Sequence, residues 1–303
     1  MRLSWGALVL PLLACVLTGL TLPTHAAGSF SFTAIDFPGA TDTYTFGIND
    51  SGEIVGFFRE AGRSGHGFLR SATGAFTAID VPGAATTSAL KINRVGQIVG
   101  TFVDARGKFH GFLRAPTGTV TSIDVPGAIG TYAQGINNAG QIVGAFTKLE
   151  NASKEPDSGV QAFLPRGFLR TETGAITTFS APGATNTTAI NSRGQIVGTF
   201  ADARGKFRGF LRDPTGVVTT IEAPVPGATG THAFDITDAG QIVGFFGGVA
   251  KGHGFLRTAT GVFATIDAPG AIQTHALGIN EAGKIVGVFE DAGARHHGFV
   301  ATQ

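Results

Sequence analysis

The residues of this chain that could bind a ligand stand where six similar segments differ from one another. Each segment contains a stretch resembling Thr-x-Ala, and position x is filled by Tyr44, Ser88, Tyr132, Thr188, His232 and His275. In two segments Lys91 and Asp235 replace a glycine that three others carry at Gly47, Gly135 and Gly278. Neutral drift at a partly exposed position is the competing explanation. Aromatic rings, imidazoles and charges beside a concave surface are the groups that orient ligands, and the predicted ligand-binding set is therefore Tyr44, Tyr132, His232, His275, Lys91 and Asp235.

Signatures of covalent catalysis and metal binding do not accompany these residues. The single cysteine, Cys15, excludes a disulfide scaffold and a cysteine-based zinc site. Four histidines recur once per segment, too far apart along the chain to share a zinc ion: His66, His110, His253 and His297. The sequence contains no Gly-x-Ser-x-Gly, His-Glu-x-x-His or phosphate-loop pattern. We therefore expect no metal and no cofactor.

Acidic residues leave two further interpretations open. An aspartate precedes several Pro-Gly turns, at Asp36, Asp80, Asp124 and Asp267. A ring of such carboxylates could hold a cation, but the simpler expectation is that each accepts hydrogen bonds from the backbone of its own turn. Carboxylate pairs such as Asp202 and Glu222 keep glycoside hydrolysis open as a chemistry, because that reaction uses two carboxyl groups.

Three motifs recur six times in fixed order, and this repetition sets the architecture that must position these side chains. Pro-Gly-Ala begins at Pro38, Pro82, Pro126, Pro182, Pro226 and Pro269. A signature close to Ile-Asn-x-x-Gly-Gln-Ile-Val-Gly begins at Ile48, Ile92, Ile136, Ile190, Ile236 and Ile279. Gly-Phe-Leu-Arg begins at Gly67, Gly111, Gly167, Gly209 and Gly254, and decays to Gly298-Phe-Val-Ala301.

Each repeat divides into four expected strands, which in the second copy span 87–93, 97–102, 110–114 and 120–124. Tight turns such as Asn93-Arg-Val-Gly96 link the first three strands to their neighbours as hairpins. Only the link from the fourth strand to the next repeat, through Pro-Gly-Ala, is a longer crossover. The chain starts with an orphan fourth strand at 30–36 and ends on an orphan third strand at 298–300, so joining its ends completes a repeat. The prediction is an all-β, six-bladed β-propeller of four-stranded antiparallel blades, with the N-terminal strand closing the C-terminal blade; a β-solenoid is the alternative.

The repeated segment resembles the repeat of a known bacterial family. Gly47-Ile-Asn-Asp-Ser-Gly-Glu-Ile-Val-Gly56 followed by His66-Gly-Phe-Leu-Arg70 is similar to the extracellular HAF-type repeat, named after a His-Ala-Phe tripeptide. The resemblance extends over residues 30–300. It implies export and a repeat fold, but it implies no catalytic residue.

The first residues are typical of an export signal. Arg2 is followed by an apolar stretch and then by Thr24-His-Ala-Ala27, which suits cleavage after Ala26. We therefore expect a signal peptide over 1–26, a six-repeat domain over 27–303 and a secreted or periplasmic location. Leu12-Leu-Ala-Cys15 also resembles a lipobox, so a lipid anchor on Cys15 is the alternative. The apolar stretch is short for a membrane span.

The charge of the chain bears on the class of partner that it could bind. The formal charge of +1, from 22 basic and 21 acidic residues, provides no footprint for nucleic acid. We expect a monomeric, non-catalytic binding module whose ligand is a glycan, a peptide or a protein. The alternatives are an exported polysaccharide hydrolase or lyase, with His232, His275 or Asp235 as acid and base, and a structural surface protein. The site should lie at the crossover end, together with the long loop over 147–159, because variation gathers there.

Overall fold

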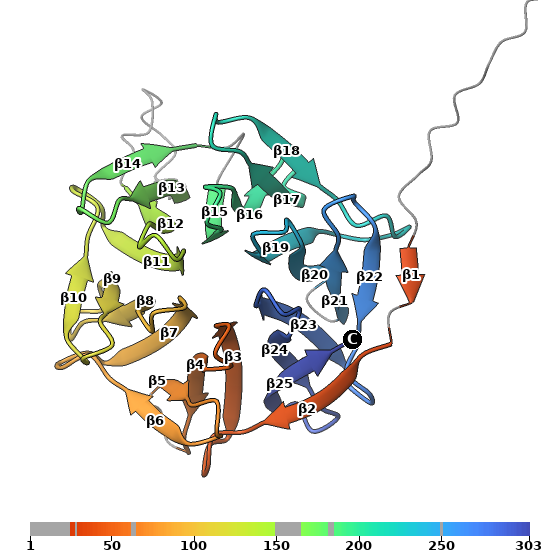
Figure 1. Ribbon diagram of the computed structural model, residues 1–303, viewed down its shortest axis with the longest axis horizontal. Coiled ribbons are helices and arrows are strands. Elements are labelled where there is room, and N and C mark those ends of the chain that lie inside the picture. Colours follow the sequence, from red (N-terminus) through yellow and green to blue (C-terminus); the bar gives the residue numbers. More distant parts are fainter. Residues whose placement is uncertain (1–24, 28, 62–64, 149–164, 181–184, 249–250) are drawn as a thin grey trace, which may run out of the picture.

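The strands of this protein form antiparallel meanders arranged around a common centre (Figure 1). The computed structural model describes residues 25–27, 29–61, 65–148, 165–180, 185–248 and 251–303. Within these ranges the chain is all-β, so no helix there is long and apolar enough to cross a membrane. The predicted signal peptide over 1–26 falls almost entirely outside the described residues, as do Cys15 and positions 149–159 of the long loop.

The strands fall into four classes by their distance from the centre. The innermost strands are β3 (Asp42–Ile48), β7 (Thr86–Ile92), β11 (Gly130–Ile136), β15 (Thr185–Ile190), β19 (Thr231–Ile236) and β23 (Gln273–Ile279). The second strands are β4 (Ile54–Arg59), β8 (Ile98–Val103), β12 (Ile142–Thr147), β16 (Ile196–Ala201), β20 (Ile242–Gly248) and β24 (Ile285–Glu290). The third strands are β5 (Gly65–Arg70), β9 (Phe109–Arg114), β13 (Pro165–Arg170), β17 (Phe207–Arg212), β21 (Lys251–Arg257) and β25 (His296–Thr302). The outermost strands are β6 (Phe76–Ile79), β10 (Val120–Ile123), β14 (Ile176–Phe179), β18 (Val218–Ile221), β22 (Phe263–Ile266) and β2 (Ser31–Ile35).

Hydrogen bonds connect these strands in repeated four-stranded order. The last meander takes its outermost strand from the N-terminal part of the chain, because β2 pairs antiparallel with β25 from Ser31–Thr302 to Ile35–Gly298. β1 (His25–Ala27) adds to the outer edge of β22 in parallel. A single parallel pair between Gly65 and Thr86 joins the meanders β3–β6 and β7–β10 into one eight-stranded sheet.

The turns between innermost and second strands follow the predicted hairpin. The Asn93 N–H donates to the Gln97 carbonyl over 3.0 Å, and the Gly96 N–H donates to the Asn93 carbonyl over 3.0 Å. Gly96 has φ of +79°, a left-handed conformation that glycine adopts without steric cost. The second repeat therefore confirms the expected strands to within one residue at each end.

A glycine packed on a phenylalanine ring builds the core of each sheet. The second strand contributes Gly56, Gly100, Gly144, Gly198, Gly244 and Gly287. The third strand contributes fully buried rings at Phe68, Phe112, Phe168, Phe210, Phe255 and Phe299. A Cβ atom on Gly144 would lie 2.8 Å from the Phe168 ring and would collide with the Tyr132 carbonyl oxygen. The glycine of Val-Gly and the phenylalanine of Gly-Phe therefore recur together, because their contact leaves no room for a side chain on that glycine.

We predict that Gly144→Ala lowers the free energy of unfolding by about 3 kcal/mol or more, because a rigid backbone carbonyl cannot move away from the new methyl group. Gly107→Ala is the matched control, since nothing lies within 4 Å of its Cβ position and only its φ of +82° opposes the change. That control should cost about 1 kcal/mol. Urea unfolding of both variants measures the difference, and equal costs would contradict the packing argument.

Candidate functional site

The four aromatic and imidazole side chains of the predicted site lie at one end of the innermost strands. Tyr44, Tyr132 and His275 are the third residues of β3, β11 and β23, and His232 is the second residue of β19. Each innermost strand begins where the crossover arrives, so this end of the sheets is called the crossover end. All four side chains are half-buried, and they therefore keep contact with solvent.

Each of these rings packs on the preceding sheet. The Tyr132 ring lies 5.1 Å from Phe109, and the His232 ring lies 5.1 Å from Phe207. Phe245 lies between two imidazoles, with centroid distances of 4.4 Å to His232 and 3.9 Å to His275. Tyr44 stacks on His296 at 5.0 Å. The rings thus fill the junctions between neighbouring sheets at the crossover end.

Exposed apolar side chains gather around the same rings. Phe109 and Phe207 are 40% and 51% exposed, and Ile129 and Ile272 are 39% and 48% exposed. All four belong to the crossovers or to the first residues of the third strands. We call the following set the aromatic rim: Tyr44, Phe109, Ile129, Tyr132, Phe207, His232, Phe245, Ile272 and His275. Clustered exposed apolar groups mark interaction sites more often than single ones do.

The structure corrects the residue that represents the fourth repeat in this series. Asn186, and not Thr188, occupies the position of Tyr132, because Asn186 pairs with Thr199 as Tyr132 pairs with Ala145. The chain between Pro-Gly-Ala and the strand is two residues shorter here, which shifts the alignment. Thr188 is 4% exposed, and its hydroxyl donates to the Ala233 carbonyl over 2.8 Å.

Burial changes the acid–base properties of the rim. Burial raises the pKa of Tyr132, and burial together with the charge of Asp42 raises the pKa of Tyr44. Burial lowers the pKa of His232. Burial, and then the neighbouring imidazoles of His232 and His296, lower the pKa of His275 to about 4. At neutral pH the two imidazoles are therefore uncharged, and each offers one hydrogen-bond donor and one acceptor.

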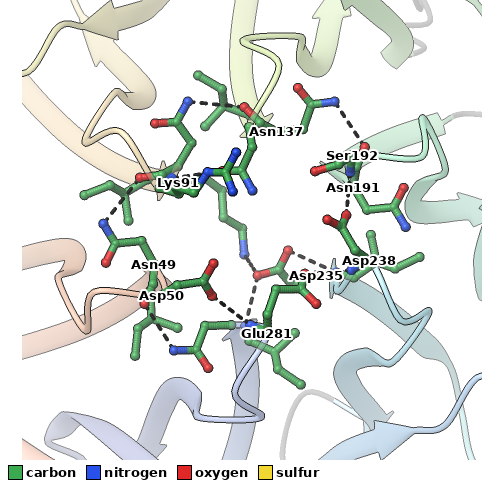
Figure 2. A pocket seen from close by; sticks show the side chains of 18 of the residues that line it. Asn49, Asp50, Lys91, Asn137, Asn191, Ser192, Asp235, Asp238 and Glu281 are labelled. Atoms are coloured by element: carbon green, nitrogen blue, oxygen red, sulfur yellow. Dashed lines mark hydrogen bonds and ion pairs between the residues drawn. The ribbon is translucent and has the colours of Figure 1, made fainter.

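Lys91 and Asp235 face each other as expected, but not beside the aromatic rim. The Lys91 ammonium lies 2.8 Å from Asp235 Oδ2 and also donates to the carbonyls of Leu277 (2.7 Å) and Phe46 (3.2 Å). Both residues stand near the last positions of β7 and β19, toward the opposite end of the strands, which we call the turn end (Figure 2). The predicted set of six residues therefore divides between the two ends.

The ion pair is buried and fully hydrogen-bonded. Lys91 is 9% exposed; burial lowers the pKa of its ammonium, and the Asp235 carboxylate opposes that shift. Asp235 accepts hydrogen bonds from the backbone N–H groups of Ile236 and Ile279, each over 3.0 Å. The three donors on Nζ and the carboxylate oxygens thus have partners, which makes the pair a structural plug at the centre around which the meanders are arranged.

A small polar pocket of about 70 Å³ lies above this plug at the turn end. Around the rim of this pocket, the side-chain amide of an asparagine in one repeat donates a hydrogen bond to a backbone carbonyl of the next repeat. These bonds run from Asn49 to Asn93 (3.3 Å), Asn93 to Asn137 (3.2 Å), Asn137 to Asn191 (3.1 Å), Asn191 to Thr237 (3.0 Å) and Asn280 to Asn49 (3.1 Å). These contacts explain the Asn of the turn motif. The pocket is smaller than the roughly 300 Å³ at which ligand sites usually begin.

Sequence reasoning missed a second set of contacts, which in four of the six repeats join the third strand to the end of the outermost strand beside it. A histidine Nδ1 contacts an aspartate fourteen residues from it in His66–Asp80 (2.8 Å), His110–Asp124 (2.8 Å) and His253–Asp267 (3.0 Å), and His297 contacts Asp36 (3.0 Å) through the chain ends. The expectation that these aspartates hold their turns was wrong, because a threonine does so instead: the Val81 N–H donates to Thr87 Oγ1 over 3.1 Å. The constant spacing of fourteen residues was the available signal.

The carboxylate pair considered for glycoside hydrolysis belongs to the same series. Arg208 stands at the histidine position and binds both Asp202 (2.8 Å) and Glu222 (2.5 Å), while Lys206 also binds Glu222 (2.8 Å). The hydrogen bond from Arg208 lowers the pKa of Asp202, and that from Lys206 lowers the pKa of Glu222. A glycosidase needs one carboxyl group whose pKa is raised, so this pair does not fit that reaction.

Comparison with known proteins supports the fold. No family model and no curated protein sequence matches the chain. The β-propeller domain of the Trilobed protease from Pyrococcus furiosus gives a TM-score of 0.57 at 13% identity, covering 91% of this chain and 93% of that one. A streptogramin B lyase gives 0.52 at 14% (90% and 98% covered), and the Aleuria aurantia lectin in complex with Fucα1-6GlcNAc gives 0.55 at 10% (86% and 93% covered). At these identities the likeness shows a β-propeller architecture and carries no function.

The plug predicts strong coupling between its two residues. Lys91→Gly or Asp235→Gly alone leaves a buried charge without its partner and should each cost about 3–5 kcal/mol of unfolding free energy. The double variant carries glycine, the residue at Gly47, Gly135 and Gly278. In a double-mutant cycle measured by denaturation, the unfolding free energy lost by the double variant should be smaller than the sum of the two single losses by at least about 1.5 kcal/mol. Additive losses would contradict a direct ion pair.

The depressed pKa of His275 predicts an acid-sensitive stability. Its unfolded-state value is near 6.5, so between pH 6.5 and about 4 the unfolded chain binds a proton that the folded chain does not. Stability is therefore complete above pH 6.5 and falls as the pH drops toward 4. His275→Phe should remove about 1–3 kcal/mol of that loss and should leave the melting temperature at pH 8 nearly unchanged. Melting curves from pH 4.5 to 8 test this, and identical pH profiles would refute it.

Proposed function

We propose that this chain is an exported six-bladed β-propeller of the HAF-repeat type that binds a ligand without catalysis. The pairing of β2 with β25 supports closure of the ring between the two ends of the chain. The three motifs that recur six times support one blade per repeat. The Arg2-led apolar stretch and the small residues before Ala27 support export.

The observation that carries the binding function is the aromatic rim. Within the described residues, four of the six large apolar side chains that are exposed lie at the crossover end: Phe109, Ile129, Phe207 and Ile272. The tyrosines and neutral imidazoles beside them add hydrogen-bonding groups to ring faces. The pocket over the plug lies at the other end of the strands. A ligand that covers these exposed side chains would lie across the surface, which suits a segment of a glycan or an extended peptide.

The contacts of the acid–base candidates argue against the alternative of a hydrolase or lyase. Asp235 is occupied by Lys91 and by two backbone N–H groups, near the end of the strands opposite His232 and His275. A histidine with a pKa of about 4 is not a proton donor at neutral pH. The solved lectin named above binds a fucosyl disaccharide, which makes oligosaccharides the first ligands to test on this fold.

Binding to printed oligosaccharides and peptides tests the proposal. The purified protein should retain at least one ligand, and Tyr132→Ala combined with His232→Ala should weaken that binding at least tenfold, because truncating a central aromatic contact costs more than about 1.4 kcal/mol. Val95→Ala is the matched control, since Val95 is 57% exposed at the turn end and should have no effect.

Three results would contradict the proposal. Binding that survives both rim substitutions removes the site, and turnover of a bound polymer that is lost in His275→Ala with folding retained favours the enzyme. An absence of saturable binding together with self-association favours a structural surface protein.

A further inference from the structure

A pocket of about 270 Å³ lies at the turn end between the first and last meanders, where the two ends of the chain meet. Thr33, Ile35, Lys284 and Val300 line it from the last meander, which includes β2. Ile48, Ser51, Gly52, Ile54, Arg70 and Ala72 line it from the first. We call this the seam pocket. It is larger than the pocket over the plug and shares only Ile48 with it.

A departure from the repeat opens the seam pocket. The third strands carry a leucine that packs against the hydrophobic cluster of the next sheet, at Leu69, Leu113, Leu169, Leu211 and Leu256. Val300 occupies this position in the last meander, because it pairs with Val286 as Leu113 pairs with Val99. A shorter side chain at this junction leaves space that leucine fills at the others.

A second departure places a free cation at the rim of this space. Gln97, at the same turn position in the second repeat, accepts a hydrogen bond from the Asn93 amide over 2.8 Å. Lys284 replaces the glutamine and cannot accept that bond, so the Asn280 amide donates only to the Asn49 carbonyl (3.1 Å). The Lys284 side chain is exposed. It lacks the hydrogen bond from the turn asparagine that holds Gln97 in the second repeat.

The lining combines an apolar floor with two positive charges. Ile35 and Ile54 are 5% and 1% exposed, and Ile48 is 6% exposed. Arg70 and Lys284 stand at the rim, none of the lining residues is acidic, and no ion pair involves either cation within the described part of the chain. The Arg70 guanidinium lies over the Phe76 ring, with its Cζ 5.8 Å from the centroid. A guanidinium and an ammonium without counter-ions beside an apolar floor favour an anion with an apolar body.

We propose that the seam pocket binds a small amphiphilic anion. The carboxylate or phosphate of the ligand lies at Arg70 and Lys284, and its short apolar body covers Ile35, Ile48, Ile54 and Val300. The pocket volume of about 270 Å³ is just below the range for small-molecule sites, roughly 300–1,000 Å³, which limits the body to a short alkyl chain or a single ring. This site is independent of the aromatic rim, because it lies at the opposite end of the strands.

Calorimetric titration of the purified protein with hexanoate, hexyl phosphate and hexan-1-ol tests the proposal. Hexanoate, hexyl phosphate or both should bind saturably with one site, and the tighter of the two identifies the head group. Hexan-1-ol should bind at least about threefold more weakly, because it lacks the charge that pairs with the two cations. Equal binding of the alcohol, or no saturable binding of either anion, would overturn the proposal.

Substitutions assign the binding to the seam pocket. Val300→Leu installs the side chain that the other five repeats carry, so it should fold, and it should weaken hexanoate at least tenfold by filling the space. Lys284→Gln installs the residue of Gln97 and should weaken hexanoate about three- to fivefold. Tyr132→Ala, at the opposite end, should leave this binding unchanged. Hexanoate binding that persists in Val300→Leu, or that is lost in Tyr132→Ala with the fold retained, would place the ligand elsewhere and refute the site.

Discussion

The contact between a backbone glycine and a buried phenylalanine ring determines how this protein is built. In every meander the glycine of the second strand lies against the phenylalanine of the third, and no methyl group fits between that glycine and the innermost strand. The glycines of the innermost strands add a second close approach: a Cβ atom on Gly135 would lie 2.7 Å from Ala189 Cα of the next sheet. Thin, uniform sheets therefore meet closely around the centre, and asparagine amides at the turn end bind five of the six repeats to the next one.

The proposed binding sites lie where the repeats depart from this common plan. Lys91 and Asp235 replace small residues and plug the centre with an ion pair. Rings at the crossover end cover the junctions between sheets and leave an apolar surface exposed. Val300 and Lys284 open a pocket where the ends of the chain meet. Each departure changes either the space or the hydrogen-bond partners that the repeated residue would provide. A rigid scaffold can acquire different sites in this way without changing its fold.

The repeats made the strands predictable from the sequence because each motif has one geometric role. The strands of the second repeat agree to within one residue, and the orphan strands at the two ends do pair through β2 and β25. The site was less predictable, because residues close in sequence lie far apart along a strand. Lys91 follows Ser88 by three residues, which is about 10 Å of extended chain, and this separates the plug from the aromatic rim. Asn186 was missed because the preceding crossover is two residues shorter, and the His66–Asp80 contact was missed because it spans two strands.

Hydrogen–deuterium exchange, measured with and without the tightest oligosaccharide or peptide that the arrays retain, tests the central claim most directly. A ligand on the aromatic rim should slow exchange at the beginnings of β11, β19 and β23 and at the first residues of β9 and β17. The turns at Asn49, Asn93 and Asn137 should exchange as before. Protection confined to those turns, with the crossover end unchanged, would contradict the account.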